Sequence, residues 1–327
     1  MKPEGAAAIS RAIREEEIRL RSRFPWLEHQ DALALIFFFG ALFATALFAV
    51  AYARGYLPWW LATGAIAVAV SVLHELEHDL IHGLYFRTRT WLQNTCMFVI
   101  WWAKLHVSPW WRTPQHLHHH RRSGQEDDLE ERLLGIGLSF GVLRLLVSLH
   151  PGVAFIQLLA LRRHIRGYST MRTVAESAPT FLTMLVIWET FFGYLRVHYG
   201  FAPAWDPAHA LPLNGWPVAR NLAVLWLFPN ILRHTCLAFA SSYCHYFGDV
   251  DPENIIEETQ ILCPWFLWPV QLFCCNFAAS HWVHHFVVNQ PFYLRLAIAG
   301  RVHAAAGKGG VRKNDFSVVT RNNRWAA

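Results

Sequence analysis

Residues 32–53 form an apolar run without a single charged side chain. A helix of this length is long enough to cross the hydrocarbon core of a bilayer. The segment before it is charged, and the run is too long for the apolar part of a signal peptide. Because 54% of the 327 residues are hydrophobic and only 16% are charged, the whole chain fits an integral membrane protein better than a soluble domain.

Other apolar segments complete the predicted architecture. Three further membrane-spanning helices are expected over 57–80, over 177–197, and from Asn221 to His245. Shorter or more polar apolar segments are expected to be interfacial or re-entrant helices buried against the bundle, namely 91–103, 134–161 and 261–280. The predicted fold is therefore an all-α integral membrane protein, with four transmembrane helices, interfacial or re-entrant helices, and a cytoplasmic cap rich in histidine.

The distribution of lysine and arginine predicts the orientation. Residues 1–31 hold six of them, 84–176 hold twelve, and the part after residue 246 holds seven. The two opposite loops hold only Arg54, Arg196 and Arg220. This asymmetry predicts a multi-pass protein with both termini in the cytoplasm, in a bacterial inner membrane.

The chain is expected to divide into three parts and to bind lipid. These parts are an N-terminal cytoplasmic helix (1–31), a membrane domain (32–300) and a basic cytoplasmic tail (301–327). Anionic lipid headgroups account for the net charge of +6, so no nucleic-acid partner is expected.

The second predicted span ends in the sequence HELEHDLIH, which places histidines at 74, 78 and 82. On a helix, residues four apart lie on the same face, about 6 Å apart along the axis. Adjacent turns can therefore offer two imidazoles to one metal ion.

Two further clusters share the pattern H-x-x-H-H, at residues 116–120 and 281–285. Residues at positions i and i+3 lie on one face of a helix, whereas the adjacent histidine is rotated by about 100°. Each motif can thus reach two neighbouring metal ions.

The histidine count favours a binuclear site. One metal ion accepts at most about six ligands, so nine histidines predict two metal ions with room for a substrate or oxygen. The predicted ligands are His78, His82, His116, His119, His120, His245, His281, His284 and His285.

These motifs resemble a known family. The sequence is similar, over about residues 35–295, to the membrane-bound fatty-acid desaturases and hydroxylases, which carry three histidine boxes. The first box corresponds to residues 78–83 with 86–89, the second to 111–112 with 116–120, and the third to 281–286 with 291–293. Residues 244–248 resemble the isolated histidine and following glycine that supply a further ligand.

The resemblance implies a non-haem di-iron centre under a cytoplasmic cap. Such a centre uses O2 as co-substrate and two external electrons to attack an unactivated C–H bond of a fatty acid or fatty acyl lipid. The expected partner is a separate electron donor, a ferredoxin- or cytochrome-type protein with its reductase. Desaturation is the expected reaction, with hydroxylation and oxidative decarboxylation to a terminal alkene left open.

The sequence departs from the family pattern at three positions. His74 precedes the first box, so the ligand pair there could be His74 and His78 instead of His78 and His82. His118 is likewise an extra histidine. Ser241 stands where some desaturases have an asparagine.

Acidic residues near the boxes can hold the ring N–H groups of ligand histidines. The candidates are Glu75, Glu77, Asp79 and the acidic residues of 126–131. Glu189 and Arg233 each fall near the middle of a predicted span, where a charge indicates function. They are expected to pair with each other, or Arg233 to meet a substrate carboxylate, with snorkelling of Arg233 to the interface as the alternative.

Two other classes of protein compete with the oxygenase. His74, Glu75 and His78 match the H-E-x-x-H motif of zinc peptidases, with Glu75 as general base. That site would leave most of the other clustered histidines unused. A metal transporter would place its ligands near the middle of the membrane, whereas these histidines cluster at one face.

Overall fold

The computed structural model describes residues 3–125, 127–128, 130, 141–143, 146, 169–200, 215–246, 250–251 and 254–321. The interfacial helix predicted over 134–161 lies largely outside these described residues. The same is true of Glu126 and Glu131 in the acidic run, and of Phe247 and Gly248 after His245.

Four helical segments are long and apolar enough to cross a membrane, as predicted. The first two are α2 (Gln30–Ala53) and α3 (Trp59–Ile81), and the third is Ala178–Arg196 within α10 (Ala178–Tyr199). The fourth, Pro217–Cys244, runs without a break through α11 (Gly215–Leu222), the π-helical turn η2 (Ala223–Leu227) and α12 (Phe228–Cys244).

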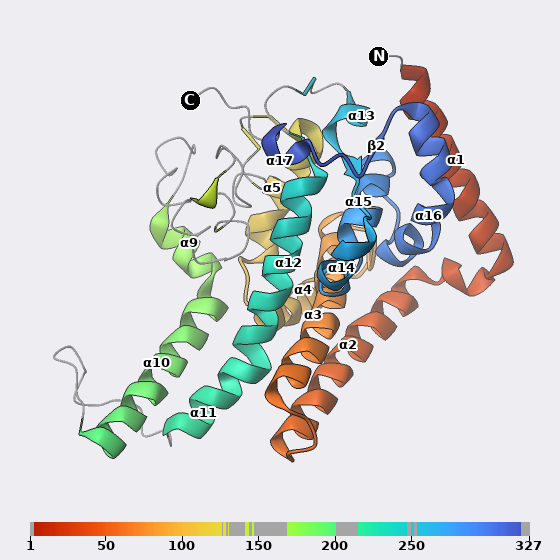
Figure 1. Ribbon diagram of the computed structural model, residues 1–327. Coiled ribbons are helices and arrows are strands. Elements are labelled where there is room, and N and C mark those ends of the chain that lie inside the picture. The colour runs from red at the N-terminus through yellow and green to blue at the C-terminus, as the bar shows by residue number, and fades with distance from the viewer. Residues whose placement is uncertain are drawn as a thin grey trace.

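The four segments run between the same two ends of the molecule. The turn between α2 and α3 and the facing ends of α10 and α11 lie at one end of the molecule, and α5, α13 and α17 lie at the other (Figure 1). Gly55 closes the α2–α3 turn with a φ of 76°, a conformation in which glycine meets no steric penalty.

Helix α3 is the central element. It packs along α2 and α12 and also contacts α4 and α5 (Figure 1). Every residue from Leu73 to Ile81 is buried, including two histidines and three acidic residues. Polar side chains in such an environment have to find partners inside the protein, so this half of α3 is where a site is expected.

Helix α1 (Pro3–Arg23) packs along α16 (Phe292–Gly309). Ile9 and Ile13 of α1 are fully buried in one apolar core with Ile298 and Val302 of α16. The charged N-terminal segment is thus amphipathic, and α16 covers its apolar face. The division of the chain at residue 300 stays a prediction, and α16 runs without interruption across that position.

Shorter elements complete the described part of the fold. They are η1 (Pro25–Glu28), α4 (Thr90–Lys104), α5 (Pro109–Arg122), α9 (Thr170–Glu176), α13 (Ile255–Glu258), η3 (Trp265–Leu267), α14 (Trp268–Leu272), α15 (Phe277–Phe286) and α17 (Val318–Arg321). Strands β1 (Gln260–Ile261) and β2 (Arg312–Lys313) form a parallel pair.

The prediction of one interfacial helix over 261–280 is wrong. That segment contains the end of β1, then η3 and α14, and only the first turn of α15. Pro264 and Pro269 cannot donate the backbone hydrogen bonds that a continuous helix needs. Cys275 and Asn276 then adopt left-handed φ angles of 51° and 55°, which end one helix and start the next.

Candidate metal centre

The C-terminal end of α3 carries the first histidine pair. His78 lies in the last turn of this helix, and His82 is the residue that caps it. Their ring centroids are 5.0 Å apart and the rings are tilted by 59°, so the two imidazoles lie on one face as the spacing predicted.

Helix α5 carries the second motif. Ser108 caps its N-terminus by accepting a hydrogen bond of 3.2 Å from the backbone N–H of Trp111, and Pro109 follows at the first helical position. Both features are strong helix-start signals. The helix then carries His116, His119 and His120.

Helix α15 and the end of α12 supply the remaining histidines. All residues of α15 are buried, including His281, His284 and His285. His245 follows α12 in extended conformation and pairs with Thr259 in an antiparallel bridge. The backbone N–H of Tyr246 donates to the carbonyl of Glu258 at 2.9 Å, which fixes the chain where it leaves α12.

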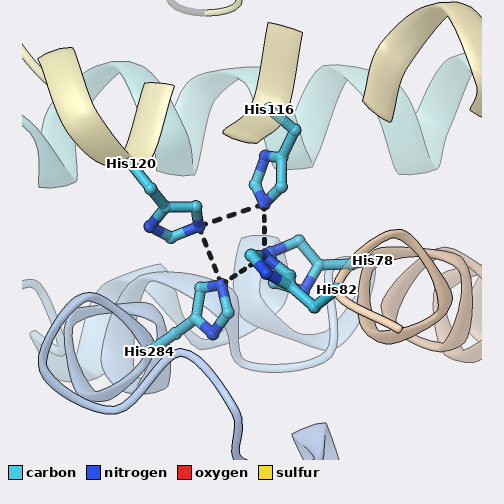
Figure 2. A group of neighbouring side chains, drawn as sticks. All are labelled: His78, His82, His116, His120 and His284. Carbon is cyan, nitrogen blue, oxygen red and sulfur yellow. Dashed lines mark hydrogen bonds between the residues drawn. The ribbon is translucent and has the colours of Figure 1, made fainter. Parts of the chain in front are cut away.

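Five of these histidines form a first group: His78, His82, His116, His120 and His284. One nitrogen from each lies within 4.8 Å of the others. The Nε2 atoms of four of them form a closed ring, in which His82 lies 2.9 Å from both His116 and His284, and His120 lies 3.1 Å and 2.9 Å from the same two (Figure 2).

The second group contains His119, His245, His281 and His285, all of them buried. One nitrogen from each again lies within 4.8 Å of the others, and the Nε2 atoms of His281 and His285 are 3.1 Å apart. The two groups are neighbours, since the ring centroids of His120 and His285 are 4.9 Å apart.

Each H-x-x-H-H motif contributes to both groups, as predicted, but with a different pairing. The first and last histidines of each motif share a group, whereas the middle histidine, at the fourth position, belongs to the other group. Residues at i and i+4 on a helix are only about 40° apart, compared with about 60° for i and i+3. The smaller angle therefore decides which imidazoles converge.

Carboxylates lie next to the Nδ1 atoms of three of these histidines, on the side of the ring away from the other imidazoles. The Nδ1 atom of His116 is 2.7 Å from Glu130, and that of His119 is 2.8 Å from Asp128. The Nδ1 atom of His285 is 3.4 Å from Glu258. A carboxylate that accepts the Nδ1 proton leaves the Nε2 lone pair free to bind a metal ion.

A comparison with known families agrees with this geometry. The profile of the family described as fatty acid desaturase matches residues 54–317, which include every histidine of the two groups. The chain belongs to the fatty acid desaturase family. Among curated proteins, no sequence matches this desaturase-family chain. The family and the four candidate spans together indicate a membrane-bound oxidoreductase.

Burial keeps the imidazoles of this desaturase-family site neutral. It lowers the pKa of His116 to about 4, although the carboxylate of Glu130 opposes the shift. Burial also lowers the pKa of His284 and His285 well below the usual value. Only neutral imidazole has a lone pair for a metal ion.

The contacts within the first group fit a metal ion. His116 donates its Nδ1 proton to Glu130, so its Nε2 atom presents a lone pair to the Nε2 atoms of His82 and His120, 2.9 Å and 3.1 Å away. The Nε2 atom of His78 is buried without a hydrogen-bond partner. A cation among these nitrogens would satisfy all of them at once.

His74 lies outside both groups. Its Nδ1 atom is 3.3 Å from the Nζ atom of Lys104, whereas His82 belongs to the first group. The geometry thus favours His78 and His82 as the pair of the first box. It also gives the zinc-peptidase hypothesis no support, because Glu75 forms an ion pair of 3.1 Å with Arg295.

Replacing His74 with alanine is expected to leave the bound metal unchanged, because His74 is in neither group. The measurement is the metal content of the purified variant beside that of His82→Ala. Loss of metal from His74→Ala, with full retention in His82→Ala, would reverse the assignment of the pair.

Replacing Asp128 with asparagine, or Glu130 with glutamine, is expected to weaken metal binding about 10- to 100-fold. The amide accepts the Nδ1 proton less strongly than a carboxylate does. Metal retained after dialysis against increasing chelator concentrations measures the effect. Asp127→Asn is the matched control, because Asp127 is half exposed and pairs with Arg122 at 3.2 Å; an equal loss in this control would contradict the assignment.

The prediction that acidic residues near the first box can hold ligand histidines needs correction for Glu77 and Glu75. Glu77 pairs with Lys104 and with Arg112, the latter at 3.2 Å. Glu75 pairs with Arg295 at 3.1 Å. Asp79 lies 3.6 Å from Nδ1 of His78 and also pairs with Arg295, at 3.0 Å.

Arg295 is a residue of the site that the sequence motifs did not identify. It is 2% exposed, and its Nη atoms lie 3.2 Å from Nδ1 of His284 and 3.4 Å from Nδ1 of His78. Its ion pairs fix Glu75 and Asp79 beside those rings. The only signal in the sequence is a single arginine in the apolar segment after the third box. Glu258, likewise not predicted, belongs to a four-residue helix far from any box.

Glu189 and Arg233 do not form an ion pair in the described part of the chain, so the predicted pairing is wrong. Glu189 lies on α10 and is partly exposed, whereas Arg233 lies on α12 and is 1% exposed. Snorkelling does not describe Arg233 either, since the side chain is buried inside the protein.

Proposed function

We propose that this protein is an O2-dependent, membrane-bound di-iron oxidoreductase that acts on C–H bonds of a fatty acid or fatty acyl chain, with desaturation as its reaction. The observation that carries the proposal is the gathering of nine histidines into two adjacent groups. They come from α3, α5, α15 and the end of α12, which are separated by up to about 200 residues. Membership of the fatty acid desaturase family supports the same assignment.

The donor atoms suit iron. Nine imidazoles, several with carboxylates behind them, are ligands that redox-active iron accepts, and two groups of five and four leave room for oxygen or substrate. Iron bound there would supply the oxidising power that an unactivated C–H bond requires. The protein holds the nitrogens in place and keeps bulk water away, since most of these histidines are buried.

The orientation and the partners are also proposals. Helices α5 and α15, which carry histidines of both groups, lie with α1 and α17 in the part of the molecule away from the α2–α3 turn (Figure 1). Because these helices belong to the three segments that are rich in lysine and arginine, we assign this end to the cytoplasm. A separate ferredoxin- or cytochrome-type donor would reach the site there, while the acyl chain enters from the lipid.

Hydroxylation and oxidative decarboxylation to a terminal alkene are alternative outcomes at the same centre. All three reactions can begin with removal of a hydrogen atom from the chain. The carbon that the protein places next to the centre decides among them.

Metal analysis and product analysis test the proposal together. The purified protein should contain about two iron ions per chain and little zinc. Cells that express it with added fatty acids should accumulate an oxidised product, identified by mass spectrometry, and cells that express the His119→Ala variant should not. One zinc ion per chain, or identical lipid profiles in the two cultures, would contradict the proposal.

A further inference from the structure

Arg233 is a buried cation that the metal centre does not use. It lies on α12 within a candidate span and is 1% exposed. Its Nε and Nη1 atoms are buried without a hydrogen-bond partner, and no ion pair joins it to a carboxylate among the described residues. A guanidinium in this position is costly unless an anion accepts its N–H groups.

The carboxylate that acts on Arg233 is already paired with other cations. Glu77 acts electrostatically on Arg233, but it already pairs with Lys104 and Arg112. Arg112, which also acts on Arg233, shares Glu77 with Lys104 and pairs with Glu130 at 2.8 Å. Burial, together with Arg112 and Arg233, lowers the pKa of Lys104 to about 7 against the attraction of Glu77. The region is short of negative charge.

An apolar cavity of about 460 Å³ lies beside this region. Its wall is formed by α2, α3, α4, α11, η2 and α12, with Val70, Ala103, Leu225 and Asn230 among the lining residues. This volume falls in the range of small-molecule sites. The wall is almost entirely hydrocarbon, which suits an acyl chain.

Two residues that line the cavity, Asn230 and Ala103, lie close in the chain to Arg233 and Lys104. Asn230 lies one helical turn before Arg233, and its Nδ2 atom donates to the carbonyl of Ala103 at 2.9 Å. Ala103 in turn precedes Lys104 in the chain. A side chain on a helix covers the turn on the N-terminal side of its own Cα, and for Arg233 that is the turn that carries Asn230. A ligand could therefore place its chain in the cavity and its headgroup at the guanidinium.

We propose that Arg233 binds the carboxylate of a free fatty acid whose chain lies in this cavity. The inference rests on the proposed function and adds the headgroup, which is an unesterified acid and not a thioester or a glycerolipid. Two carboxylate oxygens match the parallel N–H groups of a guanidinium, and the charge of the acid balances that of Arg233. An ester or thioester offers neither the charge nor the second equivalent oxygen.

Binding measurements without turnover test the proposal. The protein, purified in a neutral detergent, is titrated with hexadecanoic acid and with its methyl ester. The acid is expected to bind about 10- to 100-fold more tightly than the ester. Arg233→Met is expected to reduce binding of the acid to the level of the ester and to leave the ester unchanged. Arg233→Lys, which keeps the charge but loses the paired N–H groups, is expected to bind the acid with intermediate affinity.

Arg301→Met is the matched control, because the side chain of Arg301 is half exposed and lies 3.9 Å from Glu16. It should bind acid and ester as the wild type does. Equal affinity of the wild type for acid and ester would overturn the proposal even if Arg233→Met fails to fold. An acid preference that survives in Arg233→Met would overturn it as well, because another group would then bind the carboxylate.

The iron content separates this inference from the proposed function. A wild type that holds iron and oxidises acyl chains without preferring the acid would retain the proposed function and lose the carboxylate site. A wild type that prefers the acid through Arg233, but contains no iron and oxidises nothing, would retain the carboxylate site and lose the oxygenase. If neither lipid binds, the proposed carboxylate site is wrong. The proposed function is then tested by the iron content and the product analysis alone.

Discussion

Replacing His284 with alanine is expected to abolish turnover and to reduce bound iron from about two ions per chain to about one. The Nε2 atom of His284 lies 2.9 Å from that of His82 and 2.9 Å from that of His120, so it joins histidines from three separate elements. Loss of the group that hydrogen-bonds a metal ligand lowers metal affinity or activity about 10- to 100-fold. Loss of the ligand itself should lower them further. Metal analysis and product formation measure the effect.

The same change at two other positions distinguishes the groups. His82→Ala should behave like His284→Ala, and His119→Ala should remove the metal of the second group. Insertion into the membrane should remain normal in all three variants. His118→Ala is the control, because His118 is one-third exposed and its Nε2 lies 3.2 Å from Asp127. Retained turnover in any of the first three variants would exclude that histidine as a ligand.

Replacing Arg295 with methionine is expected to destabilise the protein by about 3–5 kcal/mol, the cost of leaving buried charges without their partner. Arg295 pairs with both Glu75 and Asp79, and each of these carboxylates is buried. Because the same guanidinium contacts His78 and His284, iron content should fall as well. The thermal midpoint in detergent and the metal content report the two effects.

Two comparisons make the Arg295 experiment decisive. Arg295→Lys keeps the charge and should retain part of the stability, although it cannot reproduce the paired N–H contacts. Arg301→Met removes an exposed arginine from the same helix and should have little effect. A thermal midpoint in Arg295→Met equal to that of the wild type would show that the buried ion pairs contribute nothing to stability.

The sequence was sufficient for features that depend on neighbours in the chain. Hydropathy located the four candidate spans to within a few residues, because a bilayer-length apolar run is visible on its own. The spacing of the histidines also predicted that each H-x-x-H-H motif would serve two groups. The predicted pairing of i with i+3 was wrong, because the smaller angle between i and i+4 brings the first and last histidines of each motif together.

Features that depend on distant contacts were not predictable. Arg295 meets Glu75 across 220 positions of the chain, and neither residue has a pattern that marks the other. The break in the segment 261–280 is a different case. Its prolines are visible in the sequence, but the prediction of a helix there rested on apolar content alone. The burial of Arg233 likewise became evident only from the packing of α12.

The pairing of α1 with α16 has a consequence for biosynthesis. Ile298 and Val302, which cover Ile9 and Ile13, are synthesised nearly 300 residues after them. Until then, the apolar face of α1 lacks its cover from α16 and is open to aggregation. Newly made protein should therefore depend on the bilayer surface or on a chaperone to shield this face until α16 has been made.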